Sequence, residues 1–93
     1  MHRTSRKRSV DVTIVNELGL HARAAARIAM LADKAESKIW MIKDGEKADA
    51  SSIIDILALA CHKGSKITLT ADCQTDTDTL TDIVNLIRKG LSD

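Results

Sequence analysis

The 93-residue chain contains no proline, no phenylalanine and no tyrosine, and Trp40 is its one aromatic residue apart from histidine. The hydrophobic core must therefore be built from isoleucine, leucine, valine, alanine and methionine. A single indole argues against a surface on which successive nucleic-acid bases stack. Without proline there is no linker to place, and the length suits one domain with one core.

Neither positive nor negative charge is in excess, because the chain has 14 basic and 13 acidic residues and a net charge of +1. This balance argues against a general polyanion binder. Basic residues nevertheless crowd the first nine positions, and no acidic residue precedes Asp11. We interpret residues 1–9 as a flexible basic N-terminal arm and residues 10–93 as the folded domain. The alternative, an arm that binds nucleic acid or anionic lipid, depends on Arg3, Arg6, Lys7 and Arg8 alone.

Long apolar runs and cysteine motifs are also missing. No stretch approaches the roughly 18 apolar residues of a membrane helix, and no apolar segment follows the basic arm as in a signal peptide. Cys61 and Cys73 match neither a C-x-x-C element nor a metal-ligand spacing, so we expect reduced, structural thiols and no metal or cofactor. These features predict a cytoplasmic protein with no membrane or nucleic-acid partner.

The apolar residues that are present repeat with strand and helix periods. Alternation and helical spacing predict strands at 10–15, 38–43, 46–50 and 66–71, and helices at 22–35, from Ser52 to about residue 60, and between Asp76 and Gly90. The fold class is α+β, an open-faced β-sandwich of order β-α-β-β-α-β-α. Its four-stranded antiparallel sheet is covered on one face by three helices.

The other face of this sheet is expected to be uncovered. Thr13, Thr68 and Thr70 fall on it, together with the apolar side chains of Trp40 and Ile42. These two are interpreted either as isolated exposed residues, which are common, or as a patch for self-association. A monomer is the default expectation.

The run Gly19-Leu20-His21-Ala22-Arg23 is where a loop turns into a helix. The backbone N–H groups of Ala22 and Arg23, the helix dipole and the Arg23 guanidinium all favour an anion beside His21. A neutral imidazole can attack phosphorus without a separate base, and it can pass the group on again. The sequence therefore predicts a phosphoryl group held on His21. The alternative is a histidine that only caps the helix.

This motif resembles the active-site motif of HPr, the histidine-containing phosphocarrier of the phosphoenolpyruvate-dependent phosphotransferase system. The chain order matches from about residue 10 to residue 91. The resemblance implies that His21 receives a phosphoryl group on Nδ1 from phosphorylated enzyme I and passes it to a histidine of an enzyme IIA, with Arg23 binding the phosphate. It implies a carrier, not an enzyme with its own turnover; the chain has no G-x-x-x-x-G-K nucleotide loop.

One position departs from the sugar-transporting members, because Ala24 stands where they usually have proline. The motif is also similar to that of nitrogen-related, regulatory branches of the family. The carrier chemistry is unaffected, but the choice between sugar uptake and a regulatory role stays open. A regulatory binding module of the same fold, acting on a kinase, an enzyme or a transcription factor, is the second interpretation.

A second resemblance falls on Ser52, which aligns with the regulatory serine that an HPr kinase/phosphorylase modifies in many bacteria. The alternative is that Ser52 only caps its helix, and Ser51 is the competing register. Ile56 and Leu59 are expected in the core with one of Ile53 and Ile54. The residues that resemble the family's partner-binding surface are Ala26, Arg27, Met30, Ile53, Ile54 and Leu57.

Overall fold

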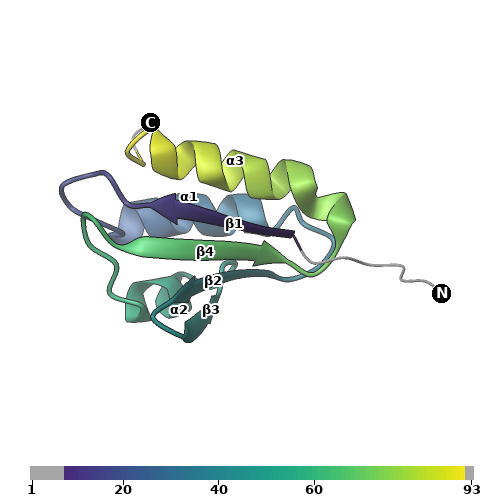
Figure 1. Cartoon of the computed structure of the whole chain (residues 1–93), viewed down its shortest axis with the longest axis horizontal. Helices are drawn as coiled ribbons and strands as arrows, with labels where there is room; N and C mark the ends of the chain where they lie inside the picture. Colours follow the sequence, from purple (N-terminus) through teal and green to yellow (C-terminus); the bar gives the residue numbers. More distant parts are fainter. Residues whose placement is uncertain (1–7, 92–93) are drawn as a thin grey trace.

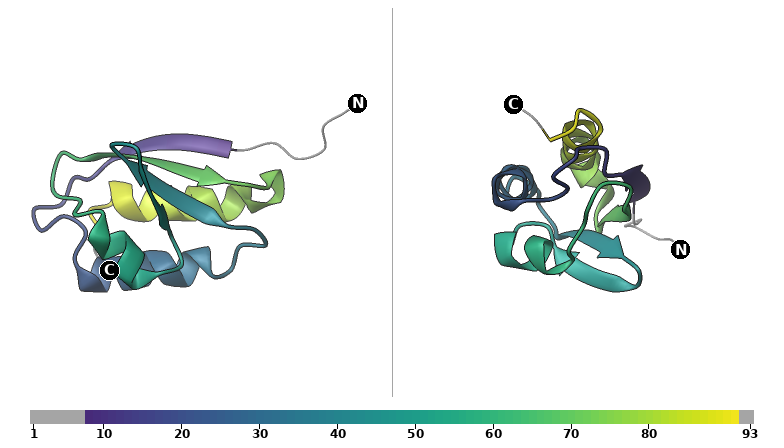
Figure 2. Two further views of the ribbon diagram at one scale, coloured as in Figure 1. Left: turned by 90° about the horizontal axis from the view of Figure 1, so that it is seen from below. Right: turned by 90° about the vertical axis from the view of Figure 1, so that its left-hand side faces the viewer.

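The structure, a computed structural model, describes residues 8–91. Its elements are β1 (Arg8–Thr13), α1 (Ala22–Ala32), β2 (Ile39–Lys43), β3 (Glu46–Asp49), α2 (Ile53–Ala58), β4 (Lys66–Ala71), the short 3₁₀ helix η1 (Gln74–Asp76) and α3 (Thr77–Arg88). The sheet is antiparallel throughout, in the order β1-β4-β2-β3. The three α-helices cover one of its faces, which confirms the predicted fold class (Figures 1 and 2).

Register follows the alternation of apolar residues along the strands. Met41 of β2 pairs with Leu69 of β4 and with Ala48 of β3, and all three side chains are buried beneath the helices. Their neighbours on each strand therefore point to the opposite face. The core also takes buried side chains from each helix, among them Ile28 of α1, Ile56 of α2 and Ile83 of α3.

Alanine lets α1 pack against its neighbours α2 and α3. Its buried residues are Ala24, Ala25, Ile28, Ala29 and Ala32. Helical spacing in the sequence predicts a buried stripe of Ala24, Ala25, Ile28, Leu31, Ala32 and Ala35, which omits Ala29. Leu31 and Ala35 are only half-buried, at the edge of the core. Small side chains on the buried face of α1 let α2 and α3 approach it.

The first strand begins and ends two residues earlier than predicted. Arg8 and Ser9, assigned from the sequence to the basic arm, pair with Ala71 and Thr70 of β4. Beyond Thr13 the chain leaves the sheet, although Ile14 still exchanges backbone hydrogen bonds with the 64–65 turn. The rest of the predicted arm, residues 1–7, lies outside the described residues.

Two helix ends also differ from the prediction. Helix α1 ends at Ala32 instead of residue 35, because the Asp76 carboxylate binds the backbone N–H groups of Glu36 and Ser37 and draws the chain away from the helix axis. Helix α2 ends at Ala58, and Ala60 takes a positive φ of 54° that no α-helix permits. The smaller differences at β2 and β3 are of one residue each.

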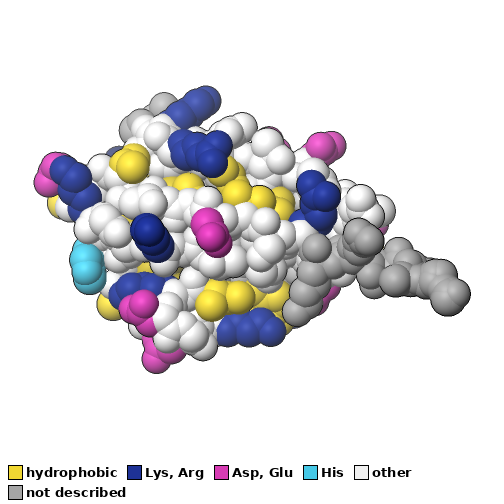
Figure 3. All heavy atoms as spheres, in the orientation of Figure 1, with side chains coloured by type: hydrophobic (Ala, Val, Ile, Leu, Met, Phe, Trp, Pro, Cys, Tyr) yellow, Lys and Arg dark blue, Asp and Glu magenta, His cyan; other side chains and the backbone are white. Residues whose placement is uncertain are grey.

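The open face of the sheet is less exposed than predicted. Trp40 and Ile42 are half-buried, and Thr70, which was expected to face solvent, is only 8% exposed. Thr70 pairs with Trp40 across the β2–β4 ladder, so the large indole lies beside it on this face. The Lys47 Nζ lies 4.3 Å from the centre of the indole ring and covers part of it. Figure 3 shows lysine and arginine side chains spread over this face instead of gathered in one patch.

Candidate functional site

His21 is the N-cap of α1. Its backbone is extended, with φ −94° and ψ 178°, and its Nδ1 accepts a long hydrogen bond of 3.4 Å from the Ala24 N–H. One ring nitrogen therefore faces the first turn of the helix, where the N–H groups of Ala22 and Arg23 have no acceptor within the helix. The half-buried imidazole is held at the positive end of the α1 dipole.

The loop before His21 is fixed against a second loop. Gly19 has φ +66°, and a Cβ there would meet the Cys61 carbonyl oxygen at 2.5 Å and the His62 Cα at 2.7 Å. Leu20 donates its N–H to the same Cys61 oxygen at 3.0 Å, and the Leu20 side chain is buried. A glycine is needed here because of both the backbone conformation and the close approach. The Gly19–Leu20 segment, which positions His21, is thus held by packing against residues 61 and 62.

His21 and Arg23 line one open surface hollow of about 350 Å³. Its other lining residues are Asn16, Glu17, Leu18, Gly90 and Leu91. The sequence prediction missed Asn16, Glu17, Gly90 and Leu91. An Asn-x-x-Gly turn signal was available for Asn16, but no local pattern places the end of α3 beside the loop that follows β1.

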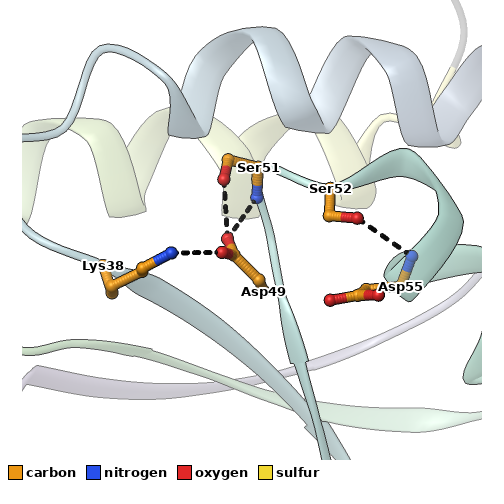
Figure 4. A network of polar contacts seen from close by, with 5 residues as sticks. All are labelled: Lys38, Asp49, Ser51, Ser52 and Asp55. Carbon is orange, nitrogen blue, oxygen red and sulfur yellow. Dashed lines mark hydrogen bonds and ion pairs between the residues drawn. The ribbon is translucent and has the colours of Figure 1, made fainter.

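Ser52 is the N-cap of α2, as predicted, and Ser51 is not. The Ser52 Oγ accepts from the Asp55 N–H at 3.2 Å (Figure 4). Ser51 instead donates both its N–H and its hydroxyl to Asp49 Oδ1, at 2.9 and 2.7 Å. Lys38 forms an ion pair with the other oxygen of Asp49. The hydrogen bonds from Lys38 and then Ser51 lower the pKa of the Asp49 carboxyl to about 2.

Apolar side chains are exposed on the two helices beside the hollow. Met30 is 70% exposed, Ile54 78%, Ile53 40% and Leu57 38%, and α1 packs against α2. The prediction that one of Ile53 and Ile54 lies in the core is wrong, because α2 is a short helix that buries only Ile56. Leu59 just after the helix is also buried, as predicted. Ala26 and Arg27 are half-buried on α1.

Both cysteines are free thiols. Cys61 is buried, and burial raises the pKa of its thiol. Within residues 8–91, no group of three or more His, Cys, Asp or Glu side chains is placed to hold a metal ion. No helix in that range is long and apolar enough to cross a bilayer.

Comparison with known proteins agrees with this geometry. Residues 8–89 match the family model described as the PTS HPr component phosphorylation site. The chain belongs to the HPr family. It is 39% identical over 77 residues to the phosphocarrier protein HPr of Cupriavidus necator, covering 83% of this chain and 86% of that protein. It is 41% identical over 74 residues to the phosphocarrier protein NPr of Shewanella violacea, covering 80% of each.

Solved HPr structures have the same fold. The crystal structure of HPr-C-His from Thermoanaerobacter tengcongensis superposes with a TM-score of 0.84 at 34% identity, covering 92% of this chain and 98% of that one. An HPr from Bacillus anthracis superposes with a TM-score of 0.81 at 30% identity, covering 87% and 96%. Family membership and fold together support a phosphocarrier role, and no catalyst with its own turnover is implied.

Proposed function

We propose that His21 accepts a phosphoryl group on Nδ1 from phosphorylated enzyme I and passes it to a histidine of an enzyme IIA, in the cytoplasm. The observation that carries this proposal is the position of Nδ1, which faces the first-turn amides of α1 in the same hollow that Arg23 lines. Phosphoryl transfer mainly needs such positioning and charge compensation.

The transfer step follows from that geometry. The Nδ1 lone pair attacks phosphorus, and a P–N bond forms while the bond between phosphorus and the donor breaks. The N–H groups of Ala22 and Arg23 and the Arg23 guanidinium then bind the phosphoryl oxygens. The imidazole, once protonated, is a good leaving group, so the same atom can give the phosphoryl group to the next protein. The step requires two partners.

The partner-binding surface in this proposal consists of Ala26, Arg27, Met30, Ile53, Ile54 and Leu57. The exposed apolar side chains of this set, Met30 and those on α2, supply the area that a partner buries, and the Arg27 charge lies at its edge. Ser52 stands at the start of α2 beside this surface. Phosphate on Ser52, added by an HPr kinase/phosphorylase, would place about two negative charges there and repel an acidic partner. We propose Ser52 as the regulatory site.

The deciding experiment uses enzyme I and phosphoenolpyruvate that carries labelled phosphate. Wild-type protein is expected to acquire a phosphate that is labile in acid and stable in base, as a phosphoimidazole is. His21→Ala should remove the label completely, whereas His62→Ala, a change in the second histidine of the described chain, should retain it. Label that persists in His21→Ala, or no label in the wild type, would overturn the proposal.

A further inference from the structure

The side-chain amide of Asn16, in the turn before His21, is buried, and only its NH₂ group has a hydrogen-bond partner among the described residues. Asn16 Nδ2 donates to the Gly19 carbonyl at 2.7 Å, while Asn16 Oδ1 is buried and accepts no hydrogen bond from residues 8–91. The orientation of the amide follows from chemistry, because a carbonyl only accepts and a flipped amide would set two oxygens against each other. Native structures leave few buried acceptors unpaired.

The His21 ring presents the complementary group. Since Nδ1 accepts from the Ala24 N–H, the neutral imidazole carries its proton on Nε2. No residue in the described range 8–91 accepts a hydrogen bond from this Nε2–H, and His21 and Asn16 line the same hollow of about 350 Å³. The two residues that carry this donor without an acceptor and this acceptor without a donor therefore line one small hollow.

We infer that Asn16 is a positioning residue for His21, with Oδ1 accepting the hydrogen bond of the Nε2–H directly once the imidazole turns toward it. The tautomer of a histidine is set by the hydrogen bond that its other nitrogen makes. Asn16 thereby keeps the lone pair on Nδ1, the nitrogen that faces the helix amides. This inference rests on the proposed role of His21 as phosphoryl acceptor.

The same contact serves the phosphorylated state. The Nε2–H is retained when Nδ1 attacks phosphorus, and the phosphorylated ring must carry this proton to be a good leaving group. The Asn16 oxygen then holds the ring in the same orientation in both states, so the phosphoryl group is presented to each partner in one geometry.

A purely structural role for Asn16 makes a different prediction. Its side-chain amide and its backbone carbonyl both bond to Gly19, the latter accepting the Gly19 N–H at 3.1 Å, so Asn16 also clamps the turn. Asn16→Asp keeps an acceptor oxygen and loses the donor to Gly19. Asn16→Ala loses both. If Asn16 only clamps the turn, the two variants should behave alike.

The test is nitrogen-15 NMR of the His21 ring at a pH where the imidazole is neutral, in wild type, Asn16→Asp, Asn16→Ala and the matched surface control Asn85→Ala. We expect the Nε2–H tautomer to dominate in wild type, Asn16→Asp and Asn85→Ala. In Asn16→Ala the ratio of Nε2–H to Nδ1–H should fall at least threefold. An amide spectrum confirms the fold, and Asn16→Leu replaces Asn16→Ala if the latter does not fold.

Chemical phosphorylation gives a second measurement without a partner protein. Phosphoramidate transfers its phosphoryl group to the imidazole and releases ammonia, and phosphorus NMR separates the Nδ1 and Nε2 products. The Nε2 product should rise in Asn16→Ala and not in Asn16→Asp. An unchanged tautomer ratio in Asn16→Ala, an Asn16→Asp ratio equal to that of Asn16→Ala, or a wild-type ring protonated on Nδ1 would overturn the inference. The tautomer measurement needs no enzyme I, so its failure is distinct from failure of the proposed function.

Discussion

Gly19 is the residue on which the position of His21 depends most directly. It combines a left-handed backbone with contact to the backbone of residues 61 and 62, and no other amino acid meets both demands. The two residues between Gly19 and the start of α1 then have little freedom, because Leu20 is buried and His21 is the helix cap. The position of the imidazole therefore depends on the packing of the Gly19 loop against residues 61 and 62, and also on the capping of α1 by His21.

Gly19→Ala is expected to lower the free energy of unfolding by about 2–4 kcal/mol, through backbone strain and displacement of the 61–62 backbone. Gly45→Ala is the matched control, since Gly45 also has a positive φ of 83° but a Cβ there would meet nothing within 4 Å. Gly45→Ala should lower the free energy of unfolding by only about 1–2 kcal/mol. Urea unfolding followed by circular dichroism measures both, and equal losses would contradict this account of Gly19.

At the scale of elements, Asp76 joins two segments that are 40 positions apart. It lies at the start of α3, is buried, and accepts from the N–H groups of Glu36 and Ser37 and from the Ser37 hydroxyl. The bond from the Ser37 hydroxyl, followed by those from the two backbone N–H groups, lowers the pKa of the Asp76 carboxyl despite its burial. This carboxylate ties the α1–β2 loop to α3.

Acid should therefore weaken the fold through Asp76 and Asp49. Their folded-state pKa values lie below the ordinary 3.8, so the stabilisation is complete above that pH and is lost as the pH falls toward the folded values, about 2 for Asp49. Asp76→Asn should cost about 1–3 kcal/mol at pH 7, and the difference from wild type should shrink toward pH 2. Urea unfolding between pH 2 and 7 measures this.

The exposed Asp82→Asn on α3 serves as the control and should change stability little at any pH in this range. A constant difference between wild type and Asp76→Asn across the series would show that the carboxylate charge is not what matters.

Elements and site residues differed in how far the sequence predicted them. Strand β4 was predicted to the residue, because its alternation is complete and its turns are marked locally. The position of His21 at the start of α1 and the cap at Ser52 were also predicted, since both depend on neighbouring residues. The end of α1 was not, because it depends on Asp76, which lies far away in the sequence. The sequence placed Ile53 and Ile54 on the partner-binding surface but also expected one of them in the core, because periodicity does not reveal that the short helix α2 buries only Ile56.

At the scale of the whole molecule, the two sides of the sheet have different surroundings. The hollow with His21 and the start of α2 with Ser52 both belong to the helical side of the sheet. Ser9 lies in the opening residues of β1, an edge strand, away from the end of that strand that leads to His21 (Figure 1). A charge added near α2 and a charge added at Ser9 should therefore have different effects on a partner.

Ser52→Asp should slow phosphoryl transfer from enzyme I several-fold, because a negative charge beside the partner-binding surface repels an acidic partner. Aspartate is itself a good N-cap, so α2 should persist. Ser9→Asp makes the same chemical change at an exposed position and should leave the rate unaltered. Initial rates at low and high salt measure both, with the effect of Ser52→Asp weakening as salt rises. Equal rates for the two variants would leave Ser52 as a cap only.

Trp40 lies on the sheet face turned away from the helices, with Lys47 4.3 Å and Lys38 5.9 Å from the centre of its ring. As the chain's sole tryptophan, it dominates the intrinsic fluorescence. Its emission should change when the sheet opens and the lysine neighbours are lost, but it should not change when another protein docks beside His21. The native fluorophore can thus follow unfolding of the isolated protein, whereas a binding assay will need a dye attached on the helical side.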